Sequence, residues 1–147
     1  MVQSRPSATR ECFATTLRKA SRLLTGLYDE ALAPSGLRST QYAILRELAV
    51  GESLTINELA RLLVLDRSGL GHSLRPLRRD GLITLDQSST DRRSVEVALT
   101  EQGRRRFEEA SALWRSAQDR VVTLLGTSMA EELREQLNGI AEDERLV

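Results

Sequence analysis

The fold depends on one stretch of the chain, residues 65–83, which reads LDRSGLGHSLRPLRRDGLI. Asp66 is a good helix N-cap, and Gly81 favours the left-handed turn that ends a helix. Between them, three leucines recur at the spacing of one buried helix face: Leu70, Leu74 and Leu77. We therefore expect a short helix from Asp66 to Gly81. Because Pro76 removes one backbone hydrogen bond, the sequence also predicts a kink or a looser turn between Gly71 and Pro76.

Another short helix precedes this one. Thr55 and Glu58 form the capping-box pattern that starts a helix, and apolar residues follow at helical spacing. A brief turn around residues 64–66 leads into the next helix. Two short helices joined by a tight turn predict a helix-turn-helix unit. A further helix is expected upstream, from Thr40 to Val50.

The periodicity changes beyond Gly81. Residues 82–86 have a short extended pattern, and apolar side chains at 95, 97 and 99 alternate with the residues between them. Such alternation is typical of strands, so the two segments predict a β-hairpin. Its connection, residues 87–93, is polar and long enough to project into solvent as a wing.

Amphipathic helices are predicted at both ends of the chain. The first should run from Phe13 to about Ala33, and the second from just after Thr100 to Gly126. Ser128 starts the capping-box pattern of a shorter last helix. These helices expose more apolar surface than a small central region can cover, so we expect a twofold homodimer. An intramolecular three-helix bundle is the alternative.

Together these patterns predict a mainly α-helical fold with a small β-hairpin. Residues 36–100 are expected to form a winged helix-turn-helix lobe. Residues 8–35 and 101–147 are expected to form a helical dimerisation region that is intertwined with the lobe. The chain length of 147 residues suits one domain of this kind.

Composition argues against several classes of protein. Lys and Arg total 21 and Asp and Glu total 21, so no overall basic charge indicates a nucleic-acid binder. With one cysteine and one histidine, a structural zinc site is implausible, and we expect no metal or other cofactor. No apolar stretch approaches the roughly 18 residues of a membrane span, and the first residues lack a signal-peptide pattern. We therefore expect a cytoplasmic protein without a membrane partner.

Positive charge is concentrated locally. Residues 67–83 carry four arginines against one aspartate, a net charge of +3, whereas residues 127–147 have a net charge of −4. The helix face opposite the three leucines consists of Ser68, His72, Arg75 and Arg79. A basic, polar helix beside a hairpin tipped with Arg92 and Arg93 suits insertion into the major groove of DNA. An ordinary solvated helix face is the alternative.

Three segments resemble the MarR family of bacterial transcriptional regulators. Residues 91–100, DRRSVEVALT, resemble the wing signature of that family. Residues 65–83 are similar to its recognition helix and first wing strand. Residues 32–45, LAPSGLRSTQYAIL, are similar to the segment that leads from its first helix into the DNA-binding lobe. These segments follow the family's order, and long terminal helices lie where the family dimerises.

The resemblance implies a homodimeric repressor that binds double-stranded DNA at a pseudopalindromic operator and leaves it when a small molecule or an oxidant arrives. Arg93 would enter the minor groove, with Asp91 orienting the wing. Four residues of the recognition helix would approach base edges or nearby phosphates: Ser68, Gly71, His72 and Arg75. The full set of predicted DNA-binding residues is Arg67, Ser68, Gly71, His72, Arg75, Arg79, Asp91, Arg92 and Arg93.

Two signal mechanisms remain open. Some relatives sense organic hydroperoxides through a first-helix cysteine held by tyrosines, and Cys12 and Tyr28 resemble such residues. Because Cys12 is two residues out of register and Ser39 replaces a second tyrosine, an incidental cysteine is the preferred interpretation and a redox role the alternative. The other mechanism uses a small, often aromatic and anionic effector between the terminal helices and the lobe. Residues that could line its pocket are Arg22, Tyr28, Tyr42 and Trp114, although such residues often only pack.

Other classes of protein fit the sequence less well. An enzyme needs an acid–base pair or a nucleophile, and His72 has no evident carboxylate or cysteine partner near it in the sequence. We therefore expect no catalytic residues. A helical protein-interaction module without DNA binding would explain the terminal helices, but it leaves the hairpin and its arginines without a role.

Overall fold

The computed structural model of the protein describes residues 12–146. Its α-helices are α1 (Phe13–Leu32), α2 (Ser39–Val50), α3 (Ile56–Leu62), α4 (Arg67–Arg79), α5 (Glu101–Leu125) and α6 (Thr127–Ala141). Its strands are β1 (Leu54–Thr55), β2 (Ile83–Gln87) and β3 (Val95–Leu99). Two 3₁₀ segments complete the described chain, η2 (Ala33–Ser35) and η3 (Glu144–Leu146).

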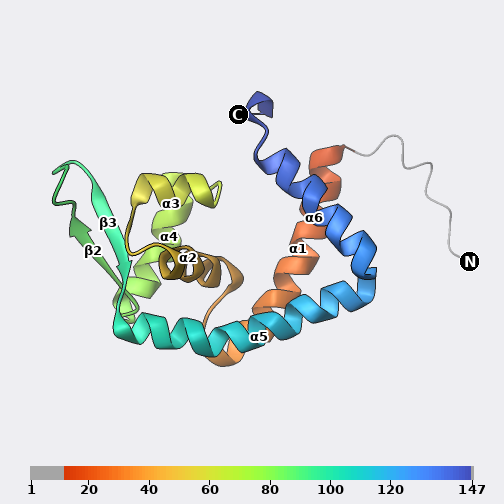
Figure 1. Ribbon diagram of the computed structural model, residues 1–147, viewed down its shortest axis with the longest axis horizontal. Coiled ribbons are helices and arrows are strands. Elements are labelled where there is room, and N and C mark those ends of the chain that lie inside the picture. Colours follow the sequence, from red (N-terminus) through yellow and green to blue (C-terminus); the bar gives the residue numbers. More distant parts are fainter. Residues whose placement is uncertain (1–11, 147) are drawn as a thin grey trace, which may run out of the picture.

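The long helix α5 joins two parts of the molecule (Figure 1). One part contains α2, α3, α4 and the strands, and we call it the central lobe. The other part contains α1 and α6, which both pack against α5. The predicted mainly α-helical fold with a small β-hairpin is confirmed. None of the described helices is long and apolar enough to cross a membrane. Residues 8–11 and 147 of the predicted dimerisation region lie outside the described residues.

The predicted hairpin is present and gains a third strand. β2 and β3 pair in antiparallel orientation, with Ile83 opposite Leu99. β1 pairs with the other edge of β3 through Leu54 and Val97, which gives the strand order β1-β3-β2. The sequence did not predict β1, because a strand of 2 residues is too short to show alternation.

The apolar core lies in the central lobe, with α2 at its centre. α2 packs against α1, α4, α5 and β3. The largest fully buried side chains are Leu32, Ile44, Leu45, Leu48, Leu59, Leu70, Leu77, Leu82 and Val97. Full burial of such a side chain stabilises the fold by about 1.5–3 kcal/mol, so this cluster is the main hydrophobic contribution to the lobe.

Both helices of the helix-turn-helix unit begin at the predicted caps. The Thr55 hydroxyl accepts a hydrogen bond from the Glu58 N–H at 3.2 Å, and the Thr55 N–H donates to the Glu58 carboxylate at 2.8 Å. Asp66 caps α4 by accepting from the Gly69 N–H at 2.6 Å. After α4 the chain reverses at Gly81, which has φ +73° as predicted.

Two local predictions need correction. α4 is α-helical from Arg67 to Arg79 with Pro76 inside it, so the looser turn, one of the two alternatives expected there, does not form, and the other alternative, a kink, stays a prediction. Leu74 and Leu77, which lie on either side of Pro76 in the sequence, are buried and hold this part of the helix against the core. The capping box at Ser128 does not form either. Gly126, with φ +83°, ends α5 and also starts α6, so the last helix begins one residue before Ser128.

The terminal helices stay largely uncovered in the single chain. Within these described helices, α1 buries only Leu32 and α6 only Ala130. Large apolar side chains remain exposed on α1, on α6 and at the end of α5: Phe13, Leu17, Leu23, Leu124, Met129 and Ile140. The alternative of an intramolecular three-helix bundle would have buried this seam, and the single chain does not do so.

α5 approaches the base of the hairpin closely at Gly103. The Thr100 hydroxyl caps this helix by accepting from the Gly103 N–H at 2.9 Å. A Cβ atom at Gly103 would lie 1.9 Å from the carbonyl oxygen of Leu82 and 3.1 Å from the Leu99 side chain. The absence of a side chain at Gly103 therefore sets how closely α5 packs against the lobe.

Replacing Gly103 by Ala should lower the free energy of unfolding by about 1–3 kcal/mol or more, because the new methyl group overlaps a backbone carbonyl. Gly71→Ala is the control, since no atom lies within 4 Å of its Cβ position. That helical substitution should raise stability by about 0.5–1 kcal/mol. Urea denaturation followed by circular dichroism measures both changes. Equal stability of the two variants would contradict the close packing at Gly103.

Candidate functional site

The buried leucine face orients α4. Leu70, Leu74 and Leu77 are 0%, 4% and 1% exposed. With 3.6 residues per turn, the opposite face of the helix points to solvent. All four residues predicted for that face are exposed: Ser68, His72, Arg75 and Arg79.

The residues of this face differ in their polar partners. Arg79 donates from Nε to Asp80 Oδ1 at 3.1 Å, so its charge is partly balanced. Arg75 has no hydrogen bond or ion pair within the described part of the chain. Gly71 is half-buried, and no atom lies within 4 Å of its Cβ position. α4 therefore presents the Arg75 guanidinium group, which has no counter-ion in the described chain, next to the backbone of Gly71, which no neighbouring side chain covers.

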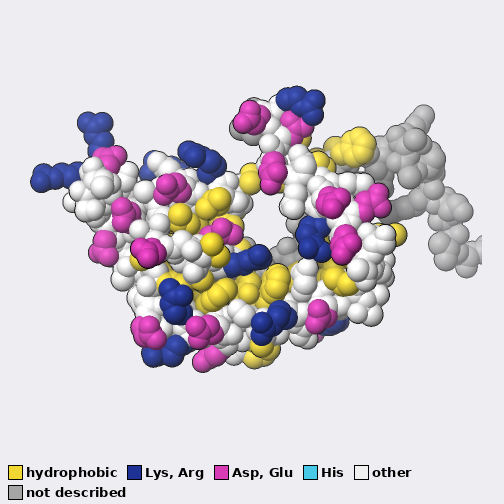
Figure 2. Space-filling view, viewed as in Figure 1, with side chains coloured by type: hydrophobic (Ala, Val, Ile, Leu, Met, Phe, Trp, Pro, Cys, Tyr) yellow, Lys and Arg dark blue, Asp and Glu magenta, His cyan; other side chains and the backbone are white. Residues whose placement is uncertain are grey.

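Polar contacts within the hairpin loop hold its tip. Asp91 accepts from the Arg93 N–H at 2.9 Å and from the Ser94 hydroxyl at 3.2 Å. Ser88 is buried and donates to Glu96 Oε1 at 2.7 Å. These bonds shape the loop backbone, while basic side chains project from the tip into solvent (Figure 2).

The wing and α4 meet at a small cleft of about 40 Å³. Its lining comes from the starts of α3 and α4 and from the wing: Thr55, Ile56, Asn57, Arg67, Arg93, Ser94 and Val95. The structure thus brings the predicted Arg67 and Arg93 to one place, whereas Arg92 is exposed outside this cleft. Asn57 is a polar neighbour that the sequence analysis missed. The signal that could have found Asn57 is its position in the first turn of α3, two residues after the Thr55 cap.

Aromatic residues gather where α1, α2 and α5 meet. Tyr42 stacks on Trp114 with ring centroids 5.8 Å apart, and the Tyr28 ring centroid lies 6.5 Å from that of Trp114. The Arg46 guanidinium lies 5.4 Å from the Trp114 ring centroid, which is a cation–π contact. These four residues line one cavity of about 220 Å³. The structure therefore brings three of the four predicted effector residues together.

A larger cavity of about 390 Å³ adjoins the first and extends to α6. It shares Tyr28, Arg46 and Trp114 with its neighbour and adds Gln118 and Arg134 among apolar side chains. The Tyr28 hydroxyl donates to Gln118 Oε1. Burial raises the pKa of Tyr28, and the charge of Arg134 opposes that shift. In Figure 2 the surface is hollowed between the central lobe and α6, with hydrophobic side chains gathered beside the hollow.

Arg22 does not belong to this site. It is exposed and lines neither cavity, because it is two positions before the cavity residue Leu24, a rotation of about 200° around α1. Arg46 and Arg134 supply the positive charge instead. Arg46 follows Tyr42 by four residues, so helical spacing was a signal that could have found it. Tyr42 is 5% exposed, so it belongs to the core as well as to the cavity wall.

Cys12 lies far from the aromatic residues that line the cavities. It is exposed directly before α1, where hydrogen bonds from the backbone N–H groups of Thr15 and Ala14 lower the pKa of its thiol. Tyr28 lies about 24 Å farther along the helix at 1.5 Å per residue. Among residues 12–146, no three His, Cys, Asp or Glu side chains are grouped to hold a metal ion.

An exposed basic helix after a tight turn, beside a small sheet with a projecting wing, defines a winged helix-turn-helix protein of the DNA-binding class. The sequence profile of the MarR family matches residues 35–94. The crystal structure of the Mycobacterium tuberculosis transcriptional regulator MosR in complex with DNA has a TM-score of 0.81 and 33% sequence identity to this chain. That match covers 90% of this chain and 95% of MosR.

Similar sequences include an HTH-type transcriptional repressor of M. tuberculosis, 30% identical over 127 residues, or 86% of this chain and 91% of that repressor. The organic hydroperoxide resistance transcriptional regulator of Bacillus subtilis is 36% identical over 92 residues, 63% of this chain. This second match spans 61% of the Bacillus protein, less than two thirds of its length. The chain belongs to the MarR family, and it is a DNA-binding transcriptional regulator rather than an enzyme.

We predict that Arg93→Ala weakens DNA binding by about 1–3 kcal/mol, because we expect the guanidinium group at the wing tip to contact the DNA. The thermal unfolding temperature should stay unchanged, since the hydrogen bond between Asp91 and the backbone of residue 93 is retained. Fluorescence anisotropy with a duplex selected by the wild-type protein from random sequences measures the affinity. Arg104→Ala, a change near the base of the hairpin, should bind normally. Normal binding by the Arg93 variant would place the wing outside the interface.

Proposed function

We propose that the protein is a homodimeric repressor that binds a pseudopalindromic operator and is released by a small aromatic anionic effector. The observation that carries this proposal is that the single chain leaves two different surfaces exposed. One is the basic face of α4 with its wing, and the other is the apolar seam on α1, α5 and α6. Residues 36–100 act as the DNA-binding lobe, and the helices on either side of them act as the dimerisation region.

The exposed seam supports dimerisation. Phe13, Leu23 and Leu124 are 94%, 78% and 75% exposed, and side chains of this size favour burial against another chain. A twofold dimer would cover the same seam on both copies. The seam is formed by helices outside the central lobe, so pairing there leaves α4 and the wing free.

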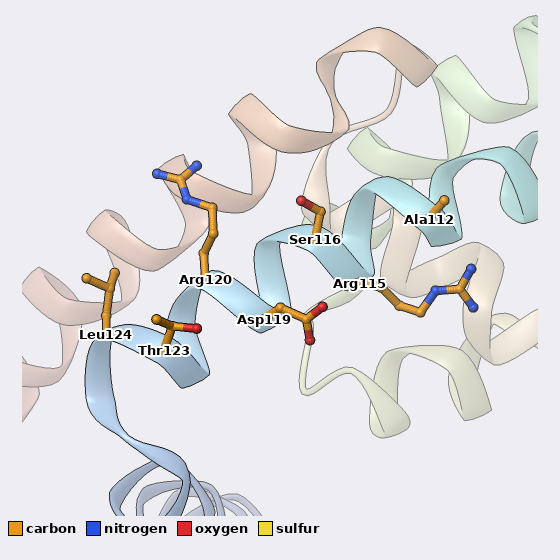
Figure 3. Close-up of a pocket in the computed structure, with 7 residues that line it drawn as sticks. All are labelled: Ala112, Arg115, Ser116, Asp119, Arg120, Thr123 and Leu124. Atoms are coloured by element: carbon orange, nitrogen blue, oxygen red, sulfur yellow. The ribbon is translucent and has the colours of Figure 1, made fainter.

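The outer face of α5 adds a hollow that suits a second chain. Its volume is about 660 Å³, and its lining is Ala112, Arg115, Ser116, Asp119, Arg120, Thr123 and Leu124. All of these residues lie on one helix, from which Arg115 and Arg120 point in different directions (Figure 3). A hollow on one helix does not enclose a small molecule. The side chain of a partner helix is a better occupant, because Ala112 and Ser116 allow close approach.

Repression follows from the placement of two α4 helices on one face of a duplex. In a twofold dimer they would enter successive major grooves, about one helical turn apart, and would cover promoter DNA between them. The M. tuberculosis relative described as a repressor supports this direction of control.

One dimer should bind a duplex with two half-sites about one helical turn apart, such as a fragment upstream of its own gene. Because Lys and Arg contacts release counterions from phosphates, affinity should fall at least about 100-fold between 50 and 200 mM salt. Electrophoretic shift assays across salt concentrations, with analytical ultracentrifugation, measure affinity and stoichiometry. A stable dimer that shows no DNA binding would instead support the helical protein-interaction module.

The adjoining cavities support an aromatic anionic effector. Tyr28 and Trp114 offer aromatic surfaces, and Arg46 and Arg134 lie at the walls. Neither arginine has an ion pair within the described residues, so both charges are available to an anion. A planar carboxylate would place its ring among the aromatic residues and its charge beside a guanidinium group.

Benzoate, phenylacetate and cinnamate are suitable probes of this site. At least one should release the protein from its duplex. Arg46→Gln should raise the effector concentration needed for release about tenfold or more, because the loss of a hydrogen bond to a charged group weakens binding by about that factor. Cys12→Ser should respond like the wild type, because Cys12 lies outside both cavities. Anisotropy of a labelled duplex measures release, and circular dichroism confirms that each variant is folded.

The hydroperoxide regulator of B. subtilis makes a cysteine-based sensor the competing function. That function predicts release of the wild-type protein by cumene hydroperoxide and no release of Cys12→Ser. Such a result, together with no response to the carboxylates, would falsify the effector proposal.

A further inference from the structure

The connection between α1 and α2 is a tightly held turn rather than a loose linker. Ser35 is buried, and its hydroxyl donates to the Leu32 carbonyl at 2.6 Å and accepts from the Leu37 N–H at 3.3 Å. Arg106 of α5 donates to the Ser35 carbonyl at 2.9 Å. Gly36 supplies the left-handed residue of the turn, with φ +75°. The direction in which α2 leaves α1 is therefore set by specific bonds.

The start of α2 lacks a side-chain cap of its own. The first N–H groups of a helix need acceptors, and the N-cap residue usually provides one through a side-chain oxygen. Arg38 occupies the N-cap position and has no such oxygen. Gln41 accepts from the Arg38 N–H at 2.9 Å, but this bond leaves the next N–H group, that of Ser39, without an acceptor from the cap.

Asp29 of α1 supplies the missing acceptor. Its Oδ1 accepts from the Ser39 N–H at 2.7 Å, and its Oδ2 lies 3.9 Å from the Arg38 guanidinium. The Asp29 side chain is 28% exposed, so water competes only in part for this bond. A carboxylate at a helix N-terminus also interacts favourably with the helix dipole. One residue of the dimerisation region thus caps the central helix of the DNA-binding lobe.

We infer that Asp29 is a positioning residue for operator recognition and that it sets the separation of the two α4 helices in the dimer. α1 belongs to the seam that joins the two chains, whereas α2 packs against α4. The bond between Asp29 and Ser39 therefore ties the lobe to the dimer scaffold at one point. This inference rests on the proposed dimer. Its readout is the preferred spacing of the two half-sites.

Two variants remove the bond from opposite sides. Asp29→Ala removes the acceptor. Ser39→Pro removes the donor while keeping α2, because proline is favoured at the first position of a helix and Arg38 already has the extended backbone that precedes proline. Glu30→Ala is the matched control, since it removes the same charge from the next residue of α1, whose side chain has no polar partner within the described chain. Asp29→Asn keeps an oxygen that can accept.

The experiment measures affinity for the selected duplex and for versions in which one to three base pairs are inserted between the half-sites. Each inserted pair rotates one half-site by about 35°, so the wild-type protein should lose affinity steeply. For Asp29→Ala and Ser39→Pro, affinity for the best spacing should fall about fivefold, the scale of a lost helix cap, and the loss per inserted pair should become smaller. Glu30→Ala should match the wild type, and Asp29→Asn should stay close to it.

Binding to a duplex with one half-site should be equal for all variants, which shows that the lobe itself is intact. Wild-type spacing dependence in both Asp29→Ala and Ser39→Pro would overturn the inference, and so would a change in only one of them. If Asp29→Ala does not fold, wild-type spacing in Ser39→Pro alone overturns it. A wild-type protein that is monomeric, or whose affinity does not depend on the half-site spacing, would contradict the proposed function rather than the role of Asp29. The two failures are therefore distinguishable.

Discussion

Leu70, Leu74 and Leu77 pack into the core that α2 and the hairpin form, and this contact orients the basic face of α4. Full burial of a leucine side chain stabilises the fold by about 1.5–3 kcal/mol, and its truncation to alanine typically costs about 2–5 kcal/mol. No exposed residue of α4 could supply a comparable free energy. The outward direction of Ser68 and Arg75 is therefore a consequence of core packing, and this exposed face needs no separate stabilising interaction.

α5 extends this constraint to the rest of the molecule. At its start, Gly103 lets the helix lie directly against the hairpin backbone, and further along, the Ser111 and Tyr42 hydroxyls lie 3.2 Å apart across to α2. Its second half carries Trp114 and Gln118, which form cavity walls, and then packs on α6. One helix thus packs against the hairpin, forms cavity walls and carries part of the exposed apolar seam.

The cavities also adjoin the connection between α1 and α2. Tyr28 lines both cavities, and the next residue, Asp29, accepts the hydrogen bond from the start of α2. A molecule that occupied the cavities would contact α1 one residue away from that bond. A regulator whose signal must alter the position of α4 has a short physical route in this arrangement, through two consecutive residues of α1.

The sequence by itself determined the elements that depend on neighbouring residues. The caps at Thr55 and Asp66, the turn at Gly81 and the hairpin follow from local hydrogen bonding and from side-chain periodicity. The exposed predicted residues of α4 follow from the same periodicity. Only the tertiary structure decided which arginines face the aromatic cavity, that β1 joins the sheet, and that Asp29 caps α2. These features depend on contacts between different elements, because the residue spacing of a helix predicts which of its faces is buried but not which element covers that face.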